Sequence, residues 1–294
     1  MSKIVVGCVG LGLMGGAISR RLIETGHAVA GYDIAPDKLA AAAKWGVEAC
    51  GSPAEVARAA DIMLVSVSST AAVEEAVLGA GGVASIGRRE GKVVVDHSTT
   101  KIDTTKRVAA ALLAATGIAF VDAPVSGGPE AAIQGRMAIM AGGGAAAIAM
   151  VTPVMERLGR FSHMGDVGAG QATKLVNQTL VLSNYCVIAE ALRLAEAYGV
   201  DAAKIPPALA SGHAGSNLLP VLFERMIARD FSPKGHVRTI LKDLEMLHEA
   251  AGKQHLTMPM AAQALTLFRL LAAQGKSESD GTAILTLYPE PPQQ

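Results

Sequence analysis

The chain is poor in aromatic residues. One Trp, four Tyr and five Phe make up only 3% of its 294 residues, although half of all residues are hydrophobic. The core must therefore be built from Ala, Val, Leu, Ile and Met. A chain of this length suggests about two domains and can bury a sizeable core.

An excess of charge of either sign is also absent. The sequence carries 26 basic and 26 acidic residues, and no block of like charge stands out. Nothing in this balance indicates a nucleic-acid or polyanion surface, so we expect no nucleic-acid partner.

Cysteine is scarce. The sequence has three cysteines, an odd number, and they are widely spaced: Cys8, Cys50 and Cys186. This argues against a disulfide framework or a metal cluster and fits a reducing cytosol. The apolar run near the N-terminus is too short for a signal peptide or a membrane span. We therefore expect a soluble cytoplasmic protein with no bound metal and no membrane association.

The first half of the sequence alternates short β-branched runs with Ala-rich stretches. Strands are predicted at residues 4–9, 28–33, 62–67, 93–96 and 119–122, and helices at residues 14–24, 36–44, 71–78 and 102–115. Strand–helix alternation with continuously apolar strands predicts a parallel sheet covered by helices on both faces. We assign residues 1–166 to a doubly wound, Rossmann-type α/β domain.

Strand signals vanish from about Gly168 onward. Residues 171–198 predict one long helix that ends before Gly199, in the position of a C-cap. Further helices are predicted at residues 202–211, 218–229, 237–251 and 260–273. We assign residues 167–294 to an all-helical substrate and oligomerisation domain, joined to the first domain by the long helix.

A glycine-rich turn follows the first predicted strand and opens the first predicted helix; it consists of Gly10, Leu11, Gly12, Leu13, Met14 and Gly15. In a dinucleotide site the first glycine permits the tight turn, the second lets a pyrophosphate approach, and the third lets helix and strand pack closely. The helix N-terminus then offers N–H groups to the phosphates. A tight turn without a ligand is the alternative.

Asp33 closes the second predicted strand, about 20 residues after the glycine turn, where an acid can accept hydrogen bonds from ribose hydroxyls. A carboxylate there also repels a 2′-phosphate, and no arginine follows at once. We therefore predict NAD as the cofactor, preferred over NADP. The alternative is that Asp33 is only the N-cap of the next helix.

Two further segments carry polar groups in an apolar setting. Ser126, Gly127 and Gly128 follow a predicted strand and form a loop whose N–H groups can converge on a carboxylate. A simple turn would also explain the two glycines.

Lys174, Asn177 and Gln178 project from one face of the long helix. Burying them calls for a polar partner, most simply a small oxygen-rich ligand; the alternative is a solvated polar face.

Together these patterns resemble the β-hydroxyacid dehydrogenase family, which includes 3-hydroxyisobutyrate and L-threonate dehydrogenases. The resemblance covers nearly the whole chain and includes residues 10–15, 96–99, 122–128, 165–178 and 242–244. It implies a doubly wound N-terminal domain, a helical C-terminal domain and an active site in the cleft between them. Family members are usually dimers or tetramers, so a homodimer or homotetramer is expected.

The resemblance also implies roles for single residues. Lys174 would be the catalytic acid–base and Asn177 its partner in orienting the substrate, beside Gln178. Ser126, Gly127 and Gly128 would grip the substrate carboxylate.

Ser98 and Thr99 would lie near the nicotinamide, and Lys242 would approach the cofactor from the second domain. Ser98 and Thr99 could instead cap the following helix, and Lys242 with Asp243 could be a surface ion pair of little weight.

The expected activity is interconversion of a small β-hydroxy acid (3-hydroxyisobutyrate-, glycerate- or threonate-like) and its semialdehyde or keto acid. Asn177 stands where phosphogluconate enzymes carry His, which argues against that substrate. Two alternatives remain: a noncatalytic dinucleotide-binding interaction module, and the same hydride chemistry on a sulfonate analogue.

Overall fold

The computed structural model describes residues 4–290. Residues 1–3 and 291–294, at the ends of the two predicted domains, lie outside the described residues. The chain divides into two compact units, Met1–Lys174 and Leu175–Gln294. The predicted domain boundary after residue 166 stays a prediction.

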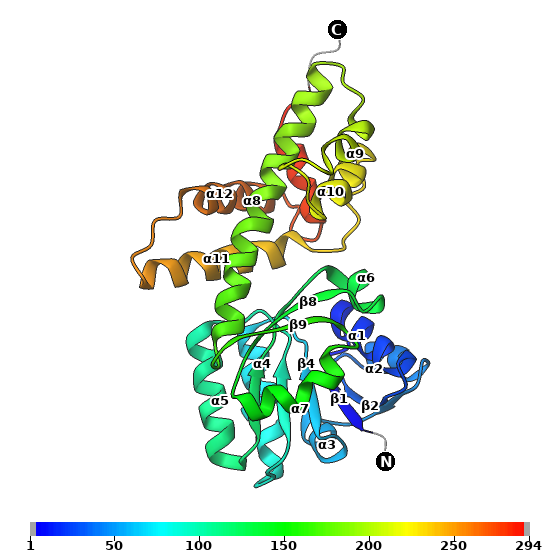
Figure 1. Ribbon diagram of the computed structural model, residues 1–294, viewed down its shortest axis with the longest axis vertical. Helices are drawn as coiled ribbons and strands as arrows, with labels where there is room; N and C mark the ends of the chain where they lie inside the picture. Colours follow the sequence, from blue (N-terminus) through cyan, green and yellow to red (C-terminus); the bar gives the residue numbers. More distant parts are fainter. Residues whose placement is uncertain (1–3, 291–294) are drawn as a thin grey trace. The chain divides into compact units, whose positions relative to one another are not determined.

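Within residues 4–290, nine strands form one sheet in the first unit (Figure 1). Their order is β3-β2-β1-β4-β5-β6-β8-β7, with β9 paired to β8. The strands are β1 (Val5–Val9), β2 (Ala28–Tyr32), β3 (Val47–Ala49), β4 (Ile62–Val65), β5 (Val93–Asp96), β6 (Ala119–Asp122), β7 (Val125–Ser126), β8 (Met137–Gly142) and β9 (Gly159–Gly165). The chain order reverses beside β1, which lies between β2 and β4 and so forms the switch point where such sheets bind ligands.

Helices cover both faces of this sheet, as the alternating pattern predicted. They are α1 (Leu13–Glu24), α2 (Pro36–Ala43), α3 (Pro53–Ala59), α4 (Thr70–Leu78), α5 (Ile102–Thr116), α6 (Gly128–Ile133) and α7 (Ala145–Met155), with a 3₁₀ turn η1 (Val83–Ile86). One face packs on α1, α6 and α7 in a cluster that includes Ile18 and Val154, and against which the single Trp45 packs. The other packs on α3, α4 and α5 through residues such as Val77 and Leu112.

The sheet is not parallel throughout. The strands from β3 to β6 are parallel, but β8 runs antiparallel to both β6 and β7. Strands β3, β7, β8 and β9 were not predicted. The predicted parallel, doubly wound sheet is therefore correct for its central strands and wrong for the edge that β7 and β8 form.

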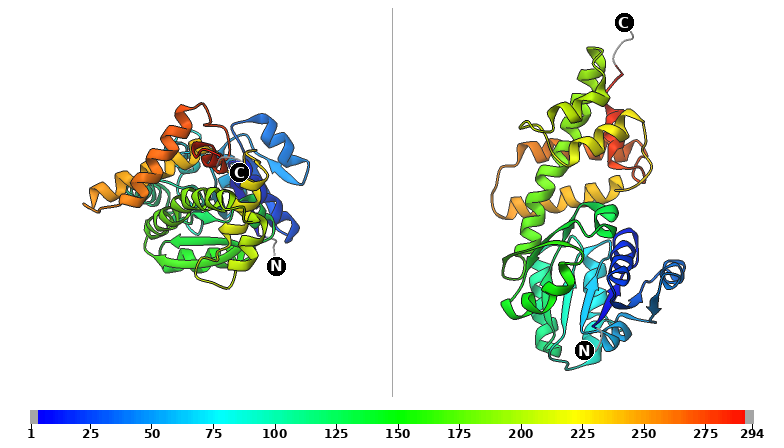
Figure 2. Two further views of the ribbon diagram at one scale, coloured as in Figure 1. Left: turned by 90° about the horizontal axis from the view of Figure 1, so that it is seen from above. Right: turned by 45° about the vertical axis from the view of Figure 1, so that its right-hand side comes forward.

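The second unit is helical around its own core. Helix α8 (Ala169–Ala197) crosses the division between the units as one helix (Figure 2). It is followed by η2 (Ala202–Lys204), α9 (Ile205–Leu209), α10 (Leu218–Ile227), α11 (Val237–Lys253), α12 (Pro259–Ala273) and η3 (Gly281–Leu287). Leu192, Phe223 and Phe268 lie in the core that these helices enclose. Gly199, in the left-handed region at φ +66°, follows the end of α8 as predicted.

By length and composition alone, α8 could cross a membrane, and 33% of its most apolar 18-residue window is buried. This is weak evidence, because a long helix in a protein core meets the same criterion. The absence of membrane association stays a prediction.

A buried ion pair organises the chain before α11. Arg225 Nη1 lies 2.8 Å from Asp280 Oδ1, with 9% and 2% of the two side chains exposed. Burial raises the pKa of Asp280, but hydrogen bonds from the Thr282 and Lys234 N–H groups and from Arg225 outweigh it and hold the pKa below its usual value. The carboxylate therefore stays charged and fixes the segment that leads into α11.

Replacement of this buried guanidinium should be costly. We expect Arg225→Met to lower the free energy of unfolding by about 3–5 kcal/mol, because Asp280 would remain buried without its charged partner. The exposed pair of Arg269 with Glu245 provides the control: Arg269→Met should cost less than about 1 kcal/mol. Urea unfolding followed by circular dichroism measures both, and equal losses would contradict the prediction.

Candidate dinucleotide and substrate site

The glycine turn lies between β1 and α1, where the sequence predicted it. Gly10 adopts φ +89°, in the left-handed region, and its N–H donates to Tyr32 O at 2.8 Å. A Cβ on Gly10 would lie 2.3 Å from Ser66 O, so only glycine fits this position.

Gly12 and Gly15 are glycines for different reasons. A Cβ on Gly15 would lie 1.9 Å from Gly10 O, so close packing of α1 on the turn requires a glycine there. A Cβ on Gly12 would meet nothing within 4 Å, and its φ of −66° suits any residue. Packing within the protein therefore does not explain Gly12. Open space above its backbone is what an approaching pyrophosphate needs, so these residues fit a dinucleotide.

Asp33 is tied to the glycine turn. Its Oδ2 accepts a hydrogen bond from Leu11 N at 2.6 Å, and its Oδ1 accepts one from Ala35 N at 2.8 Å. The N-cap of α2 is Ala35, so the interpretation of Asp33 as that N-cap is wrong. Each carboxylate oxygen keeps a second lone pair, which can accept from a ribose hydroxyl.

Ser98 and Thr99 follow the end of β5. Ser98 Oγ accepts a hydrogen bond from Val67 N at 3.0 Å, which links the ends of β5 and β4. The N-cap of α5 is Lys101, without a side-chain cap. The interpretation of Ser98 and Thr99 as caps of that helix is therefore wrong.

Gln171, in the first turn of α8, holds the loop of Ser98 and Thr99. Its Nε2 donates to Ser98 O at 2.8 Å, and its Oε1 accepts from Thr100 N at 3.0 Å. The buried Gln171 carboxamide is thus hydrogen-bonded through its nitrogen and its oxygen to the residues before and after Thr99. Sequence reasoning gave Gln171 no role.

Two buried carboxyl groups, those of Asp96 and Asp122, lie at the ends of β5 and β6 beside the loop of Ser98 and Thr99. Burial raises the pKa of Asp96 to about 7, against the opposing effect of hydrogen bonds from Ser98 and Thr100. Burial also raises the pKa of Asp122 to about 6, although the N–H groups of Gly168 and Gln171 donate to it at 2.7 Å each. These donors favour the charged form of Asp122 and attach the start of α8 to the end of β6.

His97 lies between these acids in the sequence and is also buried. Burial lowers its pKa to about 4, so the ring is neutral near pH 7. Its Nδ1 lies 2.6 Å from Ala123 O. Because a carbonyl only accepts, Nδ1 carries the proton. His97 thereby joins β5 to the segment that leads into Ser126.

Lys174 reaches the predicted anion loop. Only 7% of Lys174 is exposed, and its Nζ donates to Val125 O at 2.8 Å. Gly127 and Gly128 follow with φ of +121° and +73°, both in the region that favours glycine. The structure thus brings Lys174 to the residue before Ser126. A solvated polar face is the wrong interpretation, because Lys174 and Gln178 are each only 7% exposed.

Asn177 and Gln178 belong to a polar chain in the second unit. Asn177 Nδ2 donates to Gln178 Oε1 at 2.8 Å, and Gln178 Nε2 donates to Asp243 Oδ2 at 2.6 Å. Lys242 Nζ lies 3.2 Å from Asp243 Oδ1, and the Asp243 side chain is 6% exposed. The pair of Lys242 and Asp243 is therefore not the surface ion pair that the sequence left open.

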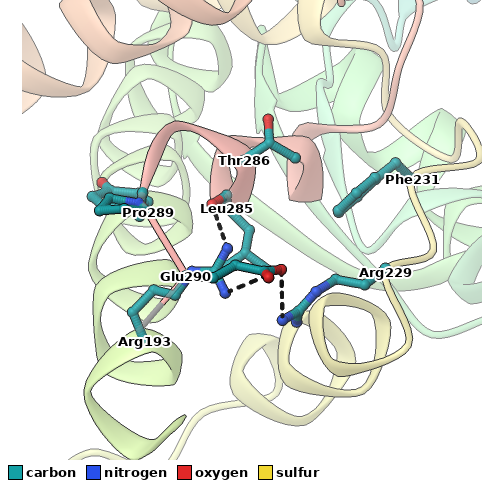
Figure 3. A pocket seen from close by; sticks show the side chains of 8 residues that line it. Arg193, Arg229, Phe231, Leu285, Thr286, Pro289 and Glu290 are labelled. Atoms are coloured by element: carbon teal, nitrogen blue, oxygen red, sulfur yellow. Dashed lines mark hydrogen bonds and ion pairs between the residues drawn. The ribbon is translucent and has the colours of Figure 1, made fainter. Parts of the chain in front are cut away.

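A pocket of about 380 Å³ in the second unit does not include these residues (Figure 3). It is lined by Arg193, Arg229, Phe231, Leu285, Thr286, Tyr288, Pro289 and Glu290. Glu196 pairs with both guanidinium groups, at 2.7 Å from Arg193 and 2.9 Å from Arg229. None of the site residues predicted from the sequence lines it.

The contrast between Gly12 and Gly15 can be measured. Gly12→Ala should leave the free energy of unfolding within about 0.5 kcal/mol but raise the Kd for the dinucleotide at least about tenfold, because the methyl group occupies the pyrophosphate path. Gly15→Ala should instead lower the free energy of unfolding by about 1–3 kcal/mol. Calorimetric titration and urea unfolding measure the two effects. Unchanged affinity in Gly12→Ala would refute this assignment.

Known families match both parts of the chain. Residues 5–180 match the family described as the NAD binding domain of 6-phosphogluconate dehydrogenase. Residues 168–288 match the family described as NAD-binding of NADP-dependent 3-hydroxyisobutyrate dehydrogenase. The resemblance stated from the motifs is therefore confirmed.

Relatives match over nearly their full length. The 2-hydroxy-3-oxopropionate reductase of Escherichia coli (strain K12) is 35% identical over 283 residues, 95% of each chain. The 2-(hydroxymethyl)glutarate dehydrogenase of Eubacterium barkeri is 32% identical, over 97% of this chain and 95% of that protein.

Among solved structures, 3-hydroxyisobutyrate dehydrogenase from Salmonella typhimurium superposes with a TM-score of 0.87 at 28% identity, covering 97% of this chain and 100% of that one. This agreement confirms the predicted fold class. The chain belongs to the β-hydroxyacid dehydrogenase family and is an NAD(P)-dependent hydroxyacid dehydrogenase of the 3-hydroxyisobutyrate dehydrogenase type.

Proposed function

We propose that the enzyme uses NAD to interconvert a small β-hydroxy acid, of the 3-hydroxyisobutyrate, glycerate or threonate kind, and its semialdehyde or keto acid. One observation carries the proposal: the buried Lys174 ammonium donates to Val125 O at 2.8 Å, directly before the loop of Ser126, Gly127 and Gly128. A proton-transfer group and an anion-binding loop are thus adjacent, as such a substrate requires.

The loop holds the substrate carboxylate in this proposal. The Ser126 hydroxyl and the N–H groups of Gly127 and Gly128 would donate to its oxygens. The left-handed backbone at both glycines is what lets successive N–H groups converge on one anion. With its carboxylate held there, the substrate can place its hydroxyl near Lys174, which supplies the orientation that catalysis needs.

Lys174 manages the proton. During oxidation, neutral Nζ accepts the proton of the substrate hydroxyl as the C–H hydride leaves, and during reduction the ammonium returns a proton to the new alkoxide. Asn177, one helical turn further along α8, holds the hydroxyl oxygen. Gln178 acts through Asn177, because both ends of the Gln178 carboxamide are bonded within the chain, to Asn177 and Asp243.

The dinucleotide, when bound, accepts or donates the hydride. We propose that residues 10–15 bind its pyrophosphate and Asp33 its ribose. Ser98 and Thr99 would lie at the nicotinamide end, on the loop that Gln171 holds. The contact of Lys242 with the cofactor is supported by the family resemblance alone.

For the protein as a whole we propose a cytoplasmic homo-oligomer without nucleic-acid or membrane partners. The balanced charge of 26 basic and 26 acidic residues supports the first exclusion.

Removal of the lysine amine tests the mechanism. Lys174→Ala should lower kcat by roughly 10²–10⁴-fold, the contribution of a positioned acid–base, and leave the dinucleotide Kd nearly unchanged. Lys204→Ala is the control, because the Lys204 side chain is 83% exposed. Retained turnover in Lys174→Ala would remove the lysine from the mechanism.

The same assay separates the alternatives. NADH absorbance is followed with a panel of small β-hydroxy acids and their sulfonate analogues. Turnover of the sulfonates alone would support the sulfonate alternative. Binding of the dinucleotide without turnover of any compound would support a noncatalytic module.

The Asp33 carboxylate should set the choice of cofactor. We expect kcat/KM with NAD to exceed that with NADP at least about tenfold, because a 2′-phosphate would approach a carboxylate that already accepts Leu11 N. No arginine stands in residues 34–37 to offset this repulsion. Asp33→Ser should lower the ratio of kcat/KM with NAD to kcat/KM with NADP. Steady-state kinetics with both cofactors measures it, and higher efficiency with NADP would overturn the proposal.

A further inference from the structure

The Gln171 carboxamide joins the start of α8 to a loop far from it in the sequence. Only 1% of Gln171 is exposed. Its Nε2 donates to Ser98 O at 2.8 Å, and its Oε1 accepts from Thr100 N at 3.0 Å, over separations of 73 and 71 positions. A leucine would fill a buried site without needing hydrogen-bond partners. Packing alone therefore does not explain a carboxamide at this position.

The loop that Gln171 holds presents one residue. Of residues 93–100, only Thr99 is not fully buried. The Asp96 carboxylate accepts Ser98 N at 2.9 Å and Thr100 Oγ1 at 3.3 Å. The residues on both sides of Thr99 are thus bonded twice, to the end of β5 and to the carboxamide on α8. The backbone of Thr99 is therefore held from both sides.

The same helical turn carries the proton-transfer lysine. Lys174 follows Gln171 by three residues, so the two side chains leave α8 on the same side. Lys174 Nζ donates to Val125 O at 2.8 Å, and the Gln171 carboxamide brackets Thr99. One turn of helix, rather than a flexible loop, therefore connects the residue that handles the proton with the loop at the nicotinamide end.

We infer that Gln171 is a positioning residue for hydride transfer, an inference that rests on the proposed function. Its carboxamide fixes Thr99, and with it the place of the nicotinamide, relative to Lys174. During oxidation the hydride takes the C–H electron pair from the substrate carbon to the nicotinamide ring, and the hydroxyl proton goes to neutral Lys174 Nζ. Both transfers start from one alcohol group, so the positions of the ring and the amine must be matched.

Amide exchange tests this link in the protein without dinucleotide or substrate. Gln171→Met keeps a long side chain but cannot donate to Ser98 O or accept strongly from Thr100 N. The Thr100 N–H should therefore exchange at least about tenfold faster, because local opening of the loop costs less free energy. Hydrogen–deuterium exchange followed by mass spectrometry measures this rate. Unchanged exchange would show that Gln171 does not hold the loop and would overturn the inference.

Thr116→Val is the matched control. Thr116 is fully buried, and its Oγ1 also bonds in two directions, to Leu112 O at 2.7 Å and from Ile118 N at 3.0 Å. It ends α5 and precedes the amino end of β6, whereas the candidate site lies at the carboxyl ends of the strands. Valine keeps the shape of threonine but removes both bonds. This variant should also lower Tm, yet leave exchange at Thr100 unchanged.

Turnover should separate the two variants. With NAD and with 3-hydroxyisobutyrate, glycerate and threonate as probes, Gln171→Met should lower kcat about 10–100-fold, because small displacements of reacting groups are costly. The Kd for NAD should stay nearly unchanged, since residues 10–15 and Asp33 are intact. Thr116→Val should keep kcat within about twofold. Steady-state kinetics and calorimetric titration measure these constants, and circular dichroism verifies folding. Equal kcat in the two variants would overturn the inference.

Gln171→Glu makes the donated hydrogen bond depend on pH. The charged carboxylate can accept from Thr100 N but has no hydrogen for Ser98 O, whereas the protonated form has one. Because burial favours the protonated form, the ratio of this variant's kcat to that of the unmodified enzyme should rise at least about threefold from about pH 8 to about pH 6. A ratio that stays low throughout would overturn the inference. Nearby titratable groups are present in both proteins and cancel in the ratio: Asp96, His97, Asp122 and Lys174.

Failure of this inference and failure of the proposed function give different results. If the unmodified enzyme turns over none of the probes, the proposed function fails, and the role of Gln171 in hydride transfer fails with it. If the unmodified enzyme turns them over and Gln171→Met does so equally well, only the positioning role of Gln171 fails.

Discussion

The carboxylate of Asp122 is the contact on which the geometry of the site depends. It accepts the N–H groups of Gly168 and Gln171 at 2.7 Å each, and so attaches the first turn of α8 to the carboxyl end of β6. The chain then runs from β6 into Val125 and Ser126, and α8 runs on to Lys174. One buried acid therefore helps to fix where Lys174 lies relative to Val125 and Ser126.

Gln171 extends this arrangement to a second strand. Its carboxamide bonds to Ser98 O and Thr100 N, which places the loop after β5 against the same helical turn. The carboxyl ends of the parallel strands β5 and β6 are thus both hydrogen-bonded to the start of helix α8. A site held in this way loses little entropy when ligands bind, because its parts are already ordered.

The sequence alone predicted those strands whose own residues favour a strand. The three valines of Val93–Asp96 and the short apolar run of Ala119–Asp122 form strands that the sequence predicted. Strands β8 and β9 were missed because neither stands out as a short β-branched or aromatic apolar run. β8 reads Met-Ala-Ile-Met-Ala-Gly, a composition that also suits a helix, and β9 is polar. Their mutual pairing makes them strands, and pairing partners are not visible in a single segment.

In the candidate site, too, residues within short motifs could be predicted and contacts between distant residues could not. The glycine turn, the Ser126 loop and Lys174 lie in short motifs, so their residues could be named from the sequence. The bonds that hold the motifs together join residues far apart in the chain, such as Asp122 with Gln171, 49 positions apart. The spacing of Lys174 and Asn177 placed both on one helix face but did not reveal that Gln178 links Asn177 to Asp243.

The scarcity of aromatic residues has an optical consequence. The single Trp45 packs on the core of the first unit, whereas Tyr185, Tyr198 and Tyr288 belong to the second. Emission excited at the red edge of indole absorption therefore reports only on the nucleotide-binding half, and phenol signals are weighted toward the helical half. The chain thus carries an intrinsic probe that can distinguish melting of one half from melting of the other, without any added dye.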